Sequence, residues 1–67
     1  MDKFSVRLKE LRSERKITQQ QLAIETGLTQ TAIAYWETGK RSPTAKAIVI
    51  LAKYFEVSTD YLLGVTD

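Results

Sequence analysis

The sequence predicts an all-α fold of five helices. Apolar residues recur at helical spacing along most of the chain, and Ser or Thr stands where each of the last four helices would begin. The three glycines, Gly27, Gly39 and Gly64, each follow a predicted helix, where left-handed C-terminal caps occur. The only strand-like run, residues 48–50, has helical flanks. We therefore expect a single compact helical domain over residues 1–67.

The first predicted helix covers residues 3–15 and begins after Asp2, a possible N-cap. Its apolar side chains, Phe4, Leu8 and Leu11, recur at helical spacing, as in an amphipathic helix. Charged residues fill most of its other positions. Several of them are expected to form a solvated surface through pairs three and four residues apart: Lys3, Arg7, Lys9, Glu10 and Glu14.

The second and third predicted helices, Thr18–Thr26 and Thr29–Thr38, are separated by a turn at Gly27. Thr18 and Gln21 have the spacing of a capping box, which marks the start of the second helix. Glycine tolerates the left-handed backbone that a helix needs in order to stop and restart within a few residues. The joint apolar face of the two helices is expected to consist of Leu22, Ala23, Leu28, Ile33 and Trp36.

The fourth and fifth predicted helices, Ala45–Phe55 and Thr59–Leu63, begin after the N-caps Thr44 and Ser58. The fourth is expected to close the core, and the fifth to seal the bottom of the domain. The side chains expected to close the core are Ile48, Leu51, Ala52 and Phe55 from the fourth helix and either Leu62 or Leu63 from the fifth.

The chain contains neither cysteine nor histidine. Thiol nucleophiles, imidazole acid–base chemistry and the usual zinc sites are therefore excluded, and we expect no catalytic residues, no enzyme activity, no metal and no cofactor. No apolar run approaches the ~20 residues of a membrane span, and the N-terminus lacks the apolar core of a signal peptide. A cytoplasmic protein with no membrane partner and no small-molecule ligand is expected.

The chain carries ten Lys and Arg residues against eight Asp and Glu residues, a formal net charge of +2. The basic excess lies in the first sixteen residues. Net charge this small is weak evidence for a nucleic-acid partner, so the local placement of the basic residues must carry the argument.

One set of residues in and after the second and third predicted helices has a characteristic spacing: Leu22-Ala23, Gly27-Leu28, Ile33 and Glu37-Thr38-Gly39-Lys40. In these residues the stretch from Thr18 to Gly39 resembles the helix-turn-helix of the Cro and lambda-type repressor family, the xenobiotic-response-element-like regulators. With its flanking helices, the resemblance covers nearly all of the chain. It implies a compact five-helix lambda repressor-like domain that acts as a sequence-specific, double-stranded DNA-binding transcriptional regulator, a repressor, with residues 29–38 in the major groove.

The outer side of the third predicted helix carries the candidate base-reading residues. Glutamine can make two hydrogen bonds to adenine, while threonine and alanine methyl groups fit against the methyl group of thymine. The family positions that touch base edges are occupied here by Gln30, Thr31 and Tyr35, and Ala34 is close enough to add apolar contact. The alternative is that Gln30 and Thr31 are ordinary surface residues.

Candidate phosphate contacts surround this helix. Helix starts offer free backbone N–H groups and the positive end of the helix dipole, and Lys40 and Arg41 follow the third helix directly. The resemblance supports Gln19, Thr38 and Lys40 as phosphate-side positions, whereas the alternative for Lys40 and Arg41 is a solvated charged loop. The full candidate set is Thr18, Gln19, Thr29, Thr38, Lys40 and Arg41.

The resemblance also implies a structural ion pair between Arg12 and Glu37 that holds the first helix against the third; the alternative is a solvated arginine. Regulators of this kind usually bind operator DNA as homodimers. Five apolar or aromatic residues are candidates for a dimer surface, and they fit equally well in the core or on an ordinary surface: Val49, Ile50, Val57, Tyr61 and Val65.

A second class of function stays open, because a fold does not fix a function. The same five helices serve in an antitoxin-like or anti-repressor adaptor that covers a protein partner. The discriminating feature is the charge around the third helix. A rim at Gln19, Lys40 and Arg41 that Lys40 and Arg41 make positive favours DNA, whereas acidic residues there would favour a protein partner.

Overall fold

The computed structural model describes residues 2–65, which form five helices and no strand. The all-α class is thus confirmed. Arg15 is the C-cap of the first helix, which ends one residue earlier than predicted. None of the helices formed by residues 2–65 has the length and apolar character needed to cross a membrane. The helices are α1 (Lys3–Glu14), α2 (Gln19–Thr26), α3 (Gln30–Glu37), α4 (Ala45–Phe55) and α5 (Thr59–Leu63).

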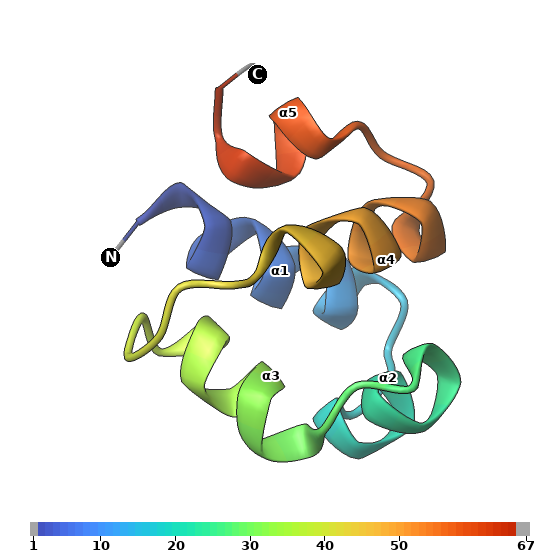
Figure 1. The fold of residues 1–67 in the computed structure, drawn as a ribbon. Coiled ribbons are helices and arrows are strands. Elements are labelled where there is room, and N and C mark those ends of the chain that lie inside the picture. Colours follow the sequence, from blue (N-terminus) through green and yellow to red (C-terminus); the bar gives the residue numbers. More distant parts are fainter. Residues whose placement is uncertain (1, 66–67) are drawn as a thin grey trace.

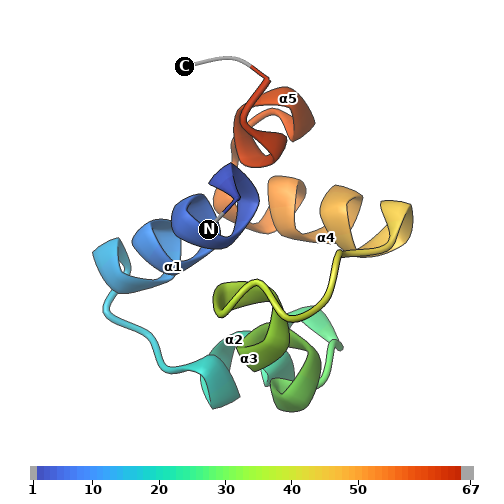
Figure 2. The same cartoon turned by 90° about the vertical axis from the view of Figure 1, so that its left-hand side faces the viewer.

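The helices are arranged in three tiers. In both views α5 lies at one end of the molecule, α2 and α3 lie at the other, and α1 and α4 lie between them (Figures 1 and 2). α1 contacts both α3 and α5, and α4 contacts both α2 and α5. The middle tier therefore joins the two ends, and α3 lies far from α5.

Each helix begins with the predicted side-chain cap. Asp2 accepts a hydrogen bond from the Ser5 N–H at 2.8 Å. Thr18 accepts from the Gln21 N–H at 3.0 Å, and the Gln21 side chain accepts from the Thr18 N–H at 2.8 Å, which completes the capping box. The remaining three helix starts are capped by Thr29, Thr44 and Ser58.

The helices end on residues with a left-handed backbone. Gly27, Gly39 and Gly64 adopt positive φ angles, as the sequence predicted. Lys16, at φ 57°, and Glu56, at φ 58°, adopt the same conformation at the ends of α1 and α4. Sequence analysis missed both positions because neither carries a glycine to mark it.

One core cluster joins all five helices. Phe4 and Trp36 meet edge to face, with ring centroids 6.3 Å apart. Ala47 is buried, while Ile48 is half-buried at the margin of the cluster. Sequence analysis placed Ile48 in the core and did not name Ala47, because helical periodicity alone does not fix which edge of an apolar stripe faces inward. The buried core residues are Phe4, Leu8, Leu22, Ala23, Ile33, Trp36, Ala47, Leu51, Ala52, Phe55 and Leu62.

Arg7 does not belong to a solvated surface, so that prediction was wrong. Its guanidinium carbon lies 4.3 Å from the centroid of the Tyr61 ring, and its Nη1 donates to the Tyr61 backbone carbonyl. This contact joins α1 to α5. The pairing rules used for the sequence consider one helix at a time, whereas this face of α1 is covered by a helix distant in the chain.

Replacing Glu56 with glycine should stabilise the fold. A non-glycine residue in the left-handed region costs about 1–2 kcal/mol, and the greater freedom of glycine in the unfolded chain returns part of that. We expect the free energy of unfolding to rise by about 0.5–1 kcal/mol for Glu56→Gly, measured by urea denaturation. Glu56→Gln is the matched control, since it removes the charge but keeps the strain; an equal gain there would contradict the explanation.

The N-cap carboxylate predicts an acid-labile part of the stability. The hydrogen bond from the Ser5 N–H lowers the pKa of Asp2 below its usual value of 3.8. A carboxylate with a depressed folded-state pKa stabilises the fold fully above the unfolded pKa, and this contribution is lost as the pH falls through the folded value. Asp2→Asn keeps the cap acceptor without the titration. As the pH falls from 6 to 3, the free energy of unfolding of the native protein should therefore decrease relative to that of Asp2→Asn. A difference between the two proteins that stays constant over this range would refute the explanation.

Candidate nucleic-acid interface

α3 has one buried side and one outward side. The buried side consists of Ile33, Trp36 and Glu37. On the other side Gln30 and Thr31 are exposed, and Ala34 and Tyr35 are half-buried. The four candidate base-reading residues thus lie together on the side of α3 turned away from the core, as helical geometry requires.

The turn between α2 and α3 sets where α3 begins. Gly27 has φ 76°, and its N–H donates to the Ala23 carbonyl at 2.9 Å. A Cβ added at Gly27 would meet no atom within 4 Å, so backbone conformation, and not space, requires the glycine. Leu28 then packs against the core, and Thr29 accepts from the Ala32 N–H at 3.1 Å to start α3.

Arg12 and Glu37 form the ion pair that the resemblance implied. Arg12 Nε lies 2.6 Å from Glu37 Oε2, and Nη2 lies 3.0 Å from Oε1. The third donor, Nη1, reaches the Ile17 carbonyl at 2.8 Å. The hydrogen bonds to Glu37 raise the pKa of Arg12 above its usual value. Because Glu37 is only 4% exposed, this ion pair fixes α3 against α1 and against the loop that follows α1.

Gln19 joins the same group of side chains. Its Nε2 donates to Glu37 Oε1 at 3.1 Å from the first residue of α2. An amide nitrogen carries two N–H groups, so one remains for another acceptor. Gln19 therefore lies between the buried carboxylate of α3 and the surface beside it, a link that sequence analysis did not find.

The three candidate threonines differ in the proton that each can offer. Thr18 and Thr29 accept hydrogen bonds as N-caps, so their hydroxyl protons have no intramolecular acceptor among the described contacts. Thr38 instead donates its hydroxyl proton to the Ala34 carbonyl at 3.0 Å. A phosphate oxygen can only accept, so the Thr38 side chain must release that bond before it can bind a phosphate group.

Lys40 and Arg41 lie directly beyond the end of α3 and are exposed. The Lys40 N–H donates to the Tyr35 carbonyl at 2.9 Å, which brings the loop back against the last turn of the helix. The Arg41 guanidinium carbon lies 4.8 Å from the centroid of the Tyr35 ring. Sequence analysis proposed separate roles for Tyr35 and Arg41 and missed their contact, since nothing in the spacing shows how the loop turns.

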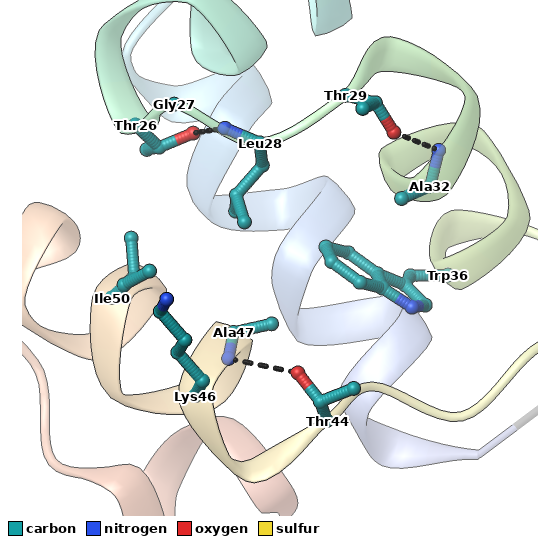
Figure 3. A pocket seen from close by; sticks show the side chains of 10 residues that line it. All are labelled: Thr26, Gly27, Leu28, Thr29, Ala32, Trp36, Thr44, Lys46, Ala47 and Ile50. Atoms are coloured by element: carbon teal, nitrogen blue, oxygen red, sulfur yellow. Dashed lines mark hydrogen bonds between the residues drawn. The ribbon is translucent and has the colours of Figure 1, made fainter.

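A groove of about 500 Å³ lies between the α2–α3 turn, α3 and α4 (Figure 3). Sequence analysis predicted no small-molecule ligand and gave no sign of this groove. The α2–α3 turn and the start of α4 lie on opposite sides of the groove, and the side chains of Leu28 and Trp36 line it between them. Its remaining walls are formed by Thr26, Gly27, Thr29, Ala32, Thr44, Lys46, Ala47 and Ile50. No group of three or more acidic residues within residues 2–65 is placed to hold a metal ion.

The candidate dimer residues differ in exposure. Val57 is half-buried and packs against the core cluster, which fits the core alternative that the sequence left open. Tyr61 is half-buried beneath Arg7. Val49 is 44% exposed and Val65 is 70% exposed. Ile50 is half-buried beside the groove.

A helix-turn-helix family model matches residues 8–62. The chain belongs to the Cro and lambda-type repressor family of helix-turn-helix domains. It is 39% identical over 64 residues to YobD of Bacillus subtilis (strain 168), an uncharacterized HTH-type transcriptional regulator, covering 96% of this chain and 57% of the relative. It is 38% identical over 61 residues to the HTH-type transcriptional activator BcrR of Enterococcus faecalis, covering 91% of this chain and 30% of BcrR. The chain thus spans little more than half the length of YobD and less of BcrR.

Solved helix-turn-helix structures confirm the fold. The P22 c2 repressor, crystallised in complex with a synthetic operator, is 30% identical with a TM-score of 0.86, covering 94% of this chain and 96% of that one. The restriction-modification controller protein C.AhdI from Aeromonas hydrophila is 32% identical with a TM-score of 0.81, covering 90% and 91%. Both likenesses cover α1 through α5 almost entirely, so the five-helix lambda repressor-like architecture is established.

Removing one partner of the buried ion pair should be strongly destabilising. Arg12→Met leaves Glu37 buried without its cation, and such a change costs about 3–5 kcal/mol. Glu37→Leu should cost less, since Arg12 can still reach the Ile17 carbonyl and solvent. The double variant Arg12→Met/Glu37→Leu should be more stable than Arg12→Met alone. Urea denaturation of the four proteins measures the coupling, and additive losses would show that the pair is not coupled.

Proposed function

We propose that this chain is a sequence-specific DNA-binding transcriptional regulator that reads the major groove with α3. The observation that carries the proposal is the outward side of α3, where Gln30, Thr31, Ala34 and Tyr35 lie together. A major groove is wide enough for an α-helix, and these side chains can pair with adenine or contact thymine methyl groups. The buried side of α3 meanwhile fixes its direction.

The groups around α3 support phosphate binding on both sides of the groove. Gln19 retains one amide N–H, and Thr18 and Thr29 retain their hydroxyl protons beside two helix starts. Lys40 and Arg41 are exposed past the other end of α3. Such contacts supply affinity and register without reading sequence. None of the positions 19, 40 and 41 carries an acidic residue, which favours DNA over the protein-adaptor alternative.

The family likeness favours a repressor. The P22 c2 repressor aligns over nearly its whole length in a complex with operator DNA. BcrR is named an activator, so a reporter gene under the selected operator is the direct measure of the sign of regulation. We further propose that the protein works in the cytoplasm, on DNA, without catalysis or a cofactor.

We propose that two copies bind a two-fold symmetric operator, with half-sites about one helical turn, ~34 Å, apart. Among the five candidate dimer residues, Val49 and Val65 are the exposed ones. Val49→Asp should weaken binding to a two-half-site duplex more than binding to a single half-site.

Selection from a pool of random duplexes tests the proposed function. The native protein should enrich a palindromic motif. Gln30→Ala should lose discrimination at one base pair in each half-site, by about 1–3 kcal/mol, because a bidentate base contact is removed. Lys40→Ala should weaken binding to all sequences alike and lower the salt dependence by about one phosphate contact.

Lys53→Ala is the matched control for the loss of one positive charge. Lys53 is exposed in the last turn of α4, outside the proposed interface. Its removal should leave both the motif and the salt slope nearly unchanged. Enrichment of no motif by the native chain, even at low salt, would reject the proposed function.

A further inference from the structure

The contact between Arg41 and Tyr35 joins a proposed phosphate contact to a proposed base contact. The guanidinium carbon lies 4.8 Å from the ring centroid, inside the ~6 Å range of cation–π attraction. Tyr35 is half-buried on α3, whereas Arg41 is exposed in the loop that follows. The ring is thus covered on one face by a residue outside its own helix.

The backbone of the same loop is also fixed to Tyr35. The Lys40 N–H donates to the Tyr35 carbonyl at 2.9 Å. The same carbonyl lies 3.2 Å from the Thr38 hydroxyl, whose single proton it shares with the closer Ala34 carbonyl. Gly39, at φ 76°, supplies the left-handed turn between Thr38 and Lys40. The Gly39 N–H donates to the Trp36 carbonyl at 3.2 Å, so two backbone hydrogen bonds, from Gly39 and from Lys40, cap the C-terminal end of α3. The loop is therefore held to the residue whose ring Arg41 covers.

The shape of a guanidinium allows two contacts at once. The flat face of a guanidinium can lie against a ring while its N–H groups point outward in the plane of the group. Those donors match two oxygens of a phosphate. A lysine at the same place carries the charge but has no plane to stack and no fork of donors, so it can make only one of these contacts well.

We propose that Arg41 is a positioning residue that sets base preference through Tyr35. It holds the Tyr35 ring in place on α3 while its outward N–H groups hold the DNA backbone. The preference at the base pair next to Tyr35 therefore depends on Arg41, which touches no base. This inference rests on the proposed function, because it specifies how the same surface discriminates between sequences.

The test measures affinities for every single-base change in the selected operator, with the native protein and three variants. Arg41→Lys should reduce discrimination by about 2- to 5-fold at one base pair per half-site, the effect expected for an exposed cation–π contact. Tyr35→Leu should reduce discrimination at that same base pair. In the double variant, Arg41→Lys should cause no further loss of discrimination, because the ring that it positions is gone.

Tyr35→Phe and Lys40→Ala are the controls. Tyr35→Phe keeps the ring, so the effect of Arg41→Lys should persist in that background. Lys40→Ala removes a neighbouring charge without touching the ring and should weaken all sequences alike. In the free protein, ring-current shifts of the Arg41 side-chain protons in NMR spectra should disappear with Tyr35→Leu, which tests the contact without DNA.

The possible failures are distinguishable. A native chain that selects no motif rejects the proposed function and this inference together. A native chain that selects a motif, with Arg41→Lys weakening every sequence equally, rejects only the inference and leaves Arg41 as a phosphate contact. Absence of the ring-current shifts also rejects the inference, because the proposed positioning contact then does not form in solution.

Discussion

Glu37 accepts hydrogen bonds from α1 and from the start of α2 at the point where α3 ends. Two come from Arg12 and one from Gln19, and Arg12 also reaches the carbonyl of Ile17. Burying the Glu37 carboxylate without these donors would cost much free energy, so we expect its hydrogen bonds to Arg12 and Gln19 to form together. An apolar contact would tolerate sliding, whereas this one fixes the rotation and position of α3 to within hydrogen-bond geometry.

This fixed orientation matters because α3 is short. It has only 8 residues, and isolated helices shorter than ~12–15 residues are marginal in water. Ile33 and Trp36 hold it to the core, Thr29 caps its start, and the turn at Gly39 closes its end. The contacts on the buried side of α3 therefore determine where its outward side chains lie. Under the proposed function, a change in the core that shifts α3 should therefore alter DNA affinity even though the changed residue does not touch DNA.

Local signals predicted the fold well, since caps such as Thr18 and turns such as Gly27 act within a few residues of themselves. Helical periodicity together with the family resemblance placed the candidate interface on α3. The local signals missed contacts that depend on how the folded chain packs: Arg7 on Tyr61, Arg41 on Tyr35, and the burial of Ser5, whose hydroxyl has no partner among the described residues. The Arg12–Glu37 pair was reached through family resemblance, because twenty-five positions separate its members and no periodicity connects them.

Intramolecular bonds also rank the proposed phosphate contacts. Gln19 can bind a phosphate without releasing Glu37, because its amide has a second N–H. A phosphate held there is then one hydrogen bond away from the carboxylate that positions α3. Thr38 must first give up the Ala34 carbonyl, so its contribution is reduced by the bond that it loses. In the proposed complex, backbone binding at Gln19 and base reading on α3 are therefore linked through Glu37, so a phosphate bound out of register at Gln19 would displace α3.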